Sequence, residues 1–453
     1  MHTAAMVAEF LGRMILQREG DGAGALSGAL SGAMPDPASC ATFGSTPGFP
    51  QAVPGEADAA TPQAWAAALG VPVAGKGAGA ASAPGTAPVS AEDVSFLAAG
   101  EYHENWLVRS PAGPVVLRGN RGGAAGSQLG LADQISYEYR VLHALAGCAA
   151  TPRPLALAPA AKLPDGDPAD VPSSPAEFPS SPASGPDTPT PTGGALLMQW
   201  LPGRPLDYRA DARHAARVFA AVHAAPVPPA VELPPPGPVP HVLPRGVLAA
   251  QPDPLAAIVA ESSALLARHA DHPLAPRMAT ARQALLDYRD RVARLAGDTR
   301  HLFADEAPVI ANTEVNSGNF LVPEGDAAAF PAPCGAWLVD WEKAVVTTRY
   351  QDLGHFLAPT TTLWKTDFTF DAATRAAFLD HYRAALRHAG QPVPDAEECA
   401  AKADVMVRAV LLRGLSWCLM AWHEYAGGGR ALAHADTFRT IERYLGNIAW
   451  FLR

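Results

Sequence analysis

A carboxylate and an amide five positions apart stand out among the residues that could do chemistry. Glu314 precedes Asn319, and both follow the apolar run at 309–311. A second apolar run leads into Asp340. Residues 309–322 and 336–343 each begin or end with an apolar strand, and a hairpin between these two segments would bring Asn319 and Asp340 together.

This combination of groups suits phosphoryl transfer. One carboxylate, here Glu314, can orient or deprotonate an attacking hydroxyl group. Oxygen ligands, here from Asn319 and Asp340, can hold Mg²⁺ against the phosphates. A plain hairpin with polar turn residues explains any one of these side chains alone, but the ordered set favours a site.

The pattern resembles that of the aminoglycoside phosphotransferase and choline kinase-like family, whose fold is similar to that of eukaryotic protein kinases. The family's catalytic loop reads H-x-D-x-x-x-x-N and is followed by a strand that ends I-D-[WF]-E. The matching positions are Asn312, Glu314 and Asn319, then 340–342. Similarity continues in segments 350–357 and 413–422, and overall it extends over residues 90–450.

The resemblance implies a two-lobed α+β protein kinase-like fold, with a small antiparallel β-lobe and a larger helical lobe. It implies ATP and Mg²⁺ as cofactors and a small molecule with a hydroxyl group as the substrate. Glu314 would be the catalytic residue, and Asn319 and Asp340 the metal ligands. Asp352 is expected to hydrogen-bond the backbone near the loop, and His223 to be structural.

Residues nearer the N-terminus are assigned to the nucleotide. Gly100 lies in a turn that could cover the phosphates, although an ordinary hairpin turn is the simpler explanation of one glycine. Arg118, supported by Glu138, could contact the phosphates, and a surface salt bridge is the alternative. Residues 196–203 resemble the family's strand that connects the lobes, whose backbone would face the adenine edge, and the same strand can also form part of the core. Its predicted cofactor contacts are Met198, Gln199 and Trp200.

Hydrophobic periodicity predicts the elements that position these residues. Short apolar runs between glycines and prolines indicate strands, and apolar residues at helical spacing indicate helices. The predicted strands are 94–99, 104–109, 114–118 and 195–201, with a further β section at 308–346 and a proline-rich connection at 229–253. The predicted helices are 131–146, 207–224, 254–269, 276–296, 371–388, 396–426 and 431–453.

Three regions are expected along the chain. Residues 1–90 are an N-terminal extension, largely flexible because small residues and proline dominate much of it. Residues 91–200 are the small N-lobe, with the nucleotide loop and a disordered insert at 157–194. Residues 201–453 are the mostly helical C-lobe, with the catalytic loop and the substrate site.

Composition narrows the class of protein. Of the 453 residues, 48% are hydrophobic, which is enough for a sizeable core, and the net charge of −10 argues against a nucleic-acid binder. The five cysteines are scattered and form no C-x-x-C motif, so neither a disulfide framework nor a zinc site is expected. A cytoplasmic location is expected instead, because disulfides are rare in that reducing compartment. No segment has the pattern of a secretion signal or a membrane span, so no membrane partner is expected.

Two functional hypotheses remain from different classes. The first is an ATP-dependent small-molecule kinase, a phosphotransferase with an alcohol group as acceptor. The second is a nucleotide-binding pseudokinase with a regulatory or binding role, because Asn312 and Glu314 stand where the family has His and Asp. An unrelated α/β enzyme is disfavoured by the order of elements. Neither the acceptor nor the oligomeric state follows from the sequence.

Overall fold

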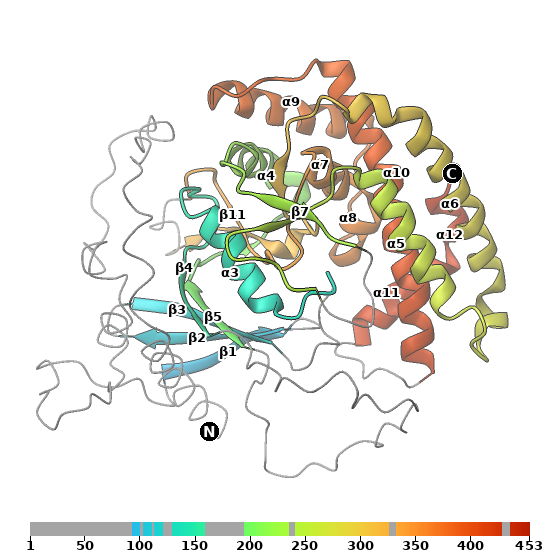
Figure 1. Cartoon of the computed structure of the whole chain (residues 1–453), viewed down its shortest axis with the longest axis horizontal. Helices are drawn as coiled ribbons and strands as arrows, with labels where there is room; N and C mark the ends of the chain where they lie inside the picture. The colour runs from blue at the N-terminus through green and yellow to red at the C-terminus, as the bar shows by residue number, and fades with distance from the viewer. Residues whose placement is uncertain are drawn as a thin grey trace, which may run out of the picture. The chain divides into compact units, whose positions relative to one another are not determined.

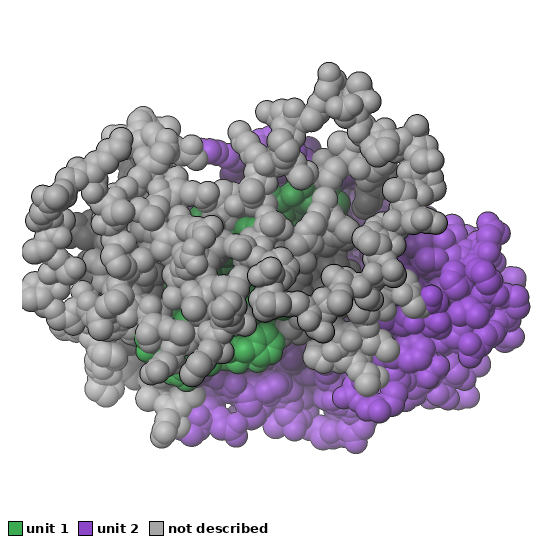
Figure 2. All heavy atoms as spheres, turned by 90° about the horizontal axis from the view of Figure 1, so that it is seen from below, with its two compact units in different colours: residues 1–36, 43–139, 154–200 green, residues 37–42, 140–153, 201–453 purple. Residues whose placement is uncertain are grey.

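The computed structural model describes most of the chain from residue 93 onward. The described residues are 93–99, 103–110, 113–120, 129–158, 194–234, 241–325, 332–427 and 435–453. They fall into two compact units, coloured separately in Figure 2. Among them, residues 93–139 and 154–200 belong to the first unit, and residues 140–153 and those from 201 onward to the second. The predicted extension 1–90 and residues 159–193 of the predicted insert lie outside the described residues.

The first unit is built on a five-stranded antiparallel sheet in the order β1-β2-β3-β5-β4. Side chains of the central strands, including Val115, Leu117 and Leu196, are buried, which explains their consecutive apolar residues. The strands are β1 (Val94–Ala99), β2 (His103–Ser110), β3 (Gly113–Asn120), β4 (Pro154–Ala158) and β5 (Ala195–Gln199).

Strand β4 corrects the predicted insert, since the strand continues through Ala158 and the loop cannot begin at residue 157. Helix α3 (Gln134–Ala144) confirms the predicted helix, although it is shorter at both ends. Residues 134–139 of α3 belong to the first unit.

The second unit is mostly helical, and its long helix α10 is central to it (Figure 1). Helix α10 packs against α5, α6, α7 and α11. The helices of this unit are α4 (Tyr208–His223), α5 (Pro254–Arg268), α6 (Ala279–Thr299), α7 (Tyr350–Leu357), α8 (Pro359–Lys365), α9 (Ala372–His388), α10 (Ala396–Ala426), α11 (Ala435–Gly446) and α12 (Ile448–Phe451).

Side-chain caps explain where several of these helices begin. Asp207, Asp371 and Asp395 each accept a hydrogen bond from a backbone N–H in the first turn of α4, α9 and α10. The predicted C-terminal helix 431–453 is instead divided at Asn447 into α11 and α12. Helices α7 and α8 were not predicted, because seven or eight residues show too little of a helical period.

By length and composition, α10 is the one helix among the described residues that could cross a membrane. Yet 78% of the most apolar 18-residue stretch of this helix is buried inside the fold. A core helix of a globular domain meets the same criteria, so this helix is weak evidence for a membrane span.

Two small sheets complete the second unit. One has the order β11-β10-β6 and the other β7-β8-β12-β9. Strands β7 and β8 correct the predicted proline-rich connection, which contains them. The strands are β6 (Arg204–Pro205), β7 (Ala230–Glu232), β8 (Leu248–Ala250), β9 (Val309–Ala311), β10 (Phe320–Val322), β11 (Trp337–Leu338) and β12 (Val345–Thr347).

The predicted α+β class is confirmed, with a small antiparallel β-lobe and a larger helical lobe.

Candidate active site

The loop that carries Glu314 and Asn319 runs from the end of β9 to the start of β10. Strand β10 pairs with β11 in antiparallel register, with Phe320 opposite Leu338. The backbone N–H of Val339 donates to the carbonyl oxygen of Asn319 at 2.8 Å. The predicted hairpin is therefore present, and it places Asn319 beside the residue that precedes Asp340.

The side chain of Asn312 ties the two carboxylate-bearing segments together. Its Nδ2 donates to the carbonyl oxygen of Asp340 at 2.7 Å, and its Oδ1 accepts from the backbone N–H of Glu314 at 3.1 Å. The sequence singled out this position only as a departure from the family's His. A side-chain amide both donates and accepts, so Asn312 supports the loop from both sides.

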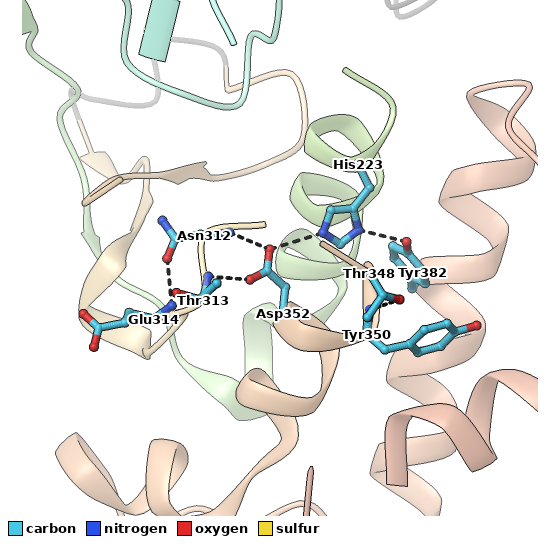
Figure 3. Close-up of polar contacts among 8 residues, drawn as sticks. All are labelled: His223, Asn312, Thr313, Glu314, Thr348, Tyr350, Asp352 and Tyr382. Atoms are coloured by element: carbon cyan, nitrogen blue, oxygen red, sulfur yellow. Dashed lines mark hydrogen bonds and ion pairs between the residues drawn. The ribbon is translucent and has the colours of Figure 1, made fainter. Parts of the chain in front are cut away.

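A buried carboxylate holds the backbone at the start of the loop (Figure 3). Asp352 of α7 accepts from the backbone N–H groups of Asn312 and Thr313 at 3.0 and 2.7 Å. Thr313 has a φ of 67°, a left-handed conformation that is strained for a β-branched residue. The expectation that Asp352 bonds the loop backbone is confirmed.

Behind Asp352 lies a short chain of polar groups that leads away from the loop. Nε2 of His223 lies 3.2 Å from Oδ2 of Asp352, and its Nδ1 lies 2.9 Å from the hydroxyl of Tyr382. Burial lowers the pKa of His223 despite the opposing effect of Asp352. A neutral imidazole can donate to Asp352 and accept from Tyr382, so His223 has the structural role expected of it.

The carboxylate of Glu314 forms an ion pair with the ammonium group of Lys343. The two side chains are 32% and 22% exposed, so the pair is open to solvent in part. Burial alone would lower the pKa of Lys343, but the charge and hydrogen bond of Glu314 outweigh it and raise that pKa. Lys343 was not among the predicted site residues, although it directly follows the motif at 340–342.

Asn319 and Asp340 offer the oxygen atoms that a magnesium ion prefers. Nδ2 of Asn319 donates to the carbonyl oxygen of Glu314 at 2.7 Å, so its Oδ1 is the atom available as a ligand. Asp340 has a φ of 66°, a left-handed backbone conformation that is uncommon for residues other than glycine and is often found at functional sites. The described residues contain no group of three or more His, Cys, Asp or Glu suited to a metal. The two side chains fit a magnesium ion whose other ligands are phosphate and water oxygens, which is its usual form of binding.

In the first unit, Arg118 of β3 and Glu138 of α3 form an ion pair. Nε of Arg118 lies 2.8 Å from Oε2 of Glu138, and the side chains are only 7% and 1% exposed. In addition, Nη2 of Arg118 lies 3.2 Å from Nδ1 of His103. The alternative of a surface salt bridge is therefore wrong, because both side chains are buried.

The remaining predicted nucleotide contacts are less informative. Gly100 lies outside the described residues. Met198 is buried in β5 between β3 and β4, whereas Gln199 and Trp200 at the end of the strand are half-buried. Their roles toward a cofactor stay predictions.

A comparison with protein families matches residues 93–393 to the phosphotransferase enzyme family. This match covers well over half of the chain, so the chain belongs to that family. The predicted resemblance is thereby confirmed.

The chain also matches solved structures, among them the three that follow. A choline/ethanolamine kinase family protein from Mesorhizobium loti is 14% identical, with a TM-score of 0.43 over 79% of this chain and 90% of that one. An ethanolamine kinase from Plasmodium vivax is 10% identical, with a TM-score of 0.48 over 78% and 82%. The aminoglycoside phosphotransferase APH(4)-Ia is 14% identical, with a TM-score of 0.46 over 80% and 93%. No curated protein matches the sequence.

Proposed function

We propose that this chain is an ATP-dependent phosphotransferase that moves the γ-phosphoryl group of ATP to a hydroxyl group of a small molecule. The observation that carries the proposal is the bonded assembly of the loop. Asn312 binds both the Glu314 and the Asp340 segments, and Asn319 binds the carbonyl of Glu314. The backbone segments that carry Glu314, Asn319 and Asp340 are thus joined in one small network, and phosphoryl transfer depends on the positions of such groups.

Glu314 orients the acceptor hydroxyl and takes its proton. In the reaction, a bond forms between the acceptor oxygen and the γ-phosphorus, and the bond from that phosphorus to the bridging oxygen of ADP breaks. ADP leaves with the electron pair. Oε2 of Glu314 is the suited atom, because Oε1 is bonded to Lys343. Positioning accounts for most of the catalysis in such a loose transition state.

Asn319, through Oδ1, and Asp340 would hold Mg²⁺. The ion would neutralise negative charge on the phosphates when bound. Arg118, held by Glu138, would contact the phosphates. Adenine contacts are assigned to the strand end at 198–200, and the turn at Gly100 to the phosphates.

A nucleotide-binding pseudokinase is the second candidate. The pairing of Glu314 with Lys343 favours it, because one oxygen of the carboxylate is already bonded to an ammonium group and only the other is left for an acceptor hydroxyl. The support that Asn312 provides favours the active enzyme, because the loop is held although the family's His is absent.

Measuring ATP binding and ATP turnover separately tests the proposal. The parent is incubated with Mg·ATP and a panel of hydroxyl metabolites, and products are identified by mass spectrometry. Glu314→Gln should reduce turnover by about 10²–10⁴-fold and spare nucleotide binding. Asp340→Ala should abolish Mg²⁺-dependent nucleotide binding in a folded protein.

Asp380→Ala is the matched control, since this carboxylate is 70% exposed on α9 and paired only with Arg383 among the described residues. Turnover by Glu314→Gln at the parent rate would show that Glu314 is not the base. A parent that binds ATP but phosphorylates nothing in the panel would be a pseudokinase.

A further inference from the structure

Basic side chains gather on the loop segment that carries Glu314. Lys343 pairs with the carboxylate of Glu314, and Nη2 of Arg413 donates to the carbonyl oxygen of Thr313 at 2.7 Å. Burial, and then the charges of Arg413 and Lys343, hold the pKa of His355 well below its ordinary value. The two cations therefore add to the effect of burial on the neighbouring imidazole.

These groups have hydrogen-bond donors to spare. An ammonium group has three N–H donors and a guanidinium group five. Within the described part of the chain, the Lys343 ammonium has one acceptor, on Glu314, and the Arg413 guanidinium has one, on Thr313. Partly buried donors without acceptors favour a ligand that supplies acceptor oxygens.

Other carboxylates near Lys343 do not cancel this charge. Glu342 also acts on the pKa of Lys343, but it is buried and makes interactions of its own. Asp352 is taken up by Asn312, Thr313 and His223. Asp340 is assigned to the metal. Glu314 already shares its charge with Lys343, so no described carboxylate in this group is left to pair with a cationic substrate.

We propose that Lys343, with Arg413, selects an acceptor that carries a carboxylate beside its reactive hydroxyl group. This proposal rests on the proposed phosphotransferase function and names the substrate class of the same site. A carboxylate would accept hydrogen bonds from Lys343 and Arg413 while Glu314 orients the hydroxyl. An ammonium-bearing acceptor would meet two cations and a carboxylate that is already paired.

The test compares acceptors that differ in charge but not in carbon skeleton. Glycerate, glycerol and 3-amino-1,2-propanediol form such a series, and hydroxy acids, sugars, amino alcohols and aminoglycosides extend it. Phosphorylation is followed by ADP release and mass spectrometry. Binding is followed by ligand-observed NMR with Mg²⁺ and a non-hydrolysable ATP analogue. The best acceptor should be an anionic hydroxy acid, preferred by roughly 10- to 100-fold in kcat/KM over its neutral analogue, as for a hydrogen bond to a charged group.

Variants separate acceptor selection from the positioning of Glu314. Lys343→Met should remove the preference for the anionic acceptor over the neutral one, whereas loss of positioning alone would lower kcat for both equally. Lys343→Arg should restore the preference in part. Lys365→Met is the matched control, because Lys365 is an exposed lysine on α8. Thermal unfolding verifies that each variant is folded.

The outcomes are distinct from those that test the function itself. A best acceptor that is a cation, or an unchanged charge preference in folded Lys343→Met, overturns the proposal. If no compound is phosphorylated, the proposed phosphotransferase function is wrong. The NMR binding measurement then decides whether the site takes an anionic ligand. Glycerate binding that weakens at least tenfold in Lys343→Met but not in Lys365→Met then supports the anion site, and equal binding overturns it.

Discussion

The two halves of the loop between β9 and β10 differ in how their polar groups are satisfied. The inner half consists of Asn312 and Thr313, whose backbone N–H groups donate to the buried carboxylate of Asp352. The outer half runs from Glu314 to Asn319, and in it the partly exposed Glu314 pairs with the partly exposed Lys343. The inner half is closed to solvent and fixed in conformation, whereas the outer half keeps atoms for a ligand. We infer that stability resides mainly in the first half and chemistry in the second.

The sharpest test of this division removes the inner carboxylate. Asp352→Ala should lower the free energy of unfolding by about 2–6 kcal/mol, because two buried N–H groups lose their acceptor at about 1–3 kcal/mol each. Urea unfolding measures the loss. The exposed Asp380→Ala should change stability by no more than about 0.5 kcal/mol. A loss of that small size at Asp352 would show that the inner half is not what holds the loop.

Asn312→Ala should have the next largest effect, a loss of about 1–3 kcal/mol. The change leaves the Asp340 carbonyl and the Glu314 N–H without their side-chain partner. The matched control is Asn316→Ala, because among the described residues the side chain of Asn316 accepts only from the backbone N–H of Gly318. Chemical denaturation of both variants compares them, and an equal loss would deny Asn312 its bridging role.

The free energy of unfolding should also decrease in acid, because His223 bonds the Asp352 carboxylate that anchors the inner half. The pKa of His223 is lowered in the folded protein, so below its ordinary value of about 6.5 the unfolded chain binds more protons and is favoured. The contribution is present above that pH and is lost as the pH falls, at up to about 1.4 kcal/mol per pH unit for this group. Unfolding at pH 7.5 and 5.5 measures the slope. His223→Gln should flatten it, and an unchanged slope would contradict the assignment.

The smallest change in stability is expected in the outer half. Glu314→Gln should change the free energy of unfolding by less than about 1 kcal/mol, because partly exposed ion pairs contribute little. The same variant should lose most of its turnover. If it instead destabilises as much as Asp352→Ala, the two halves are not distinct.

The sequence allowed much of this site to be predicted, and the limits have a physical cause. Glu314, Asn319 and Asp340 belong to one ordered motif, so the segments that carry them could be expected to meet, and their roles stay predictions. The ion pair of Glu314 with Lys343 joins residues 29 positions apart, and the contact of Arg413 with Thr313 joins residues 100 apart. Such pairs depend on packing that no local pattern encodes.

The same distinction explains the elements that were found and missed. Helix α10 was predicted with its observed ends, because 31 residues show many helical turns and Asp395 caps the start. Strands β7 and β8 have three residues each, which is too short for alternation to be recognised.

The position of Asp352 also bears on the timescale on which the loop can move. Its two acceptor oxygens receive amide protons from the loop, and its partner His223 belongs to α4 while Tyr382 belongs to α9. Releasing those amides requires that packing between helices be disturbed, so their protons should exchange with solvent only in rare, cooperative openings. The amide of Glu314 bonds instead to a side chain of the loop itself, and a small local fluctuation can free it. The carboxylate side of the loop can therefore adjust to a ligand on a fast timescale while its anchor stays closed.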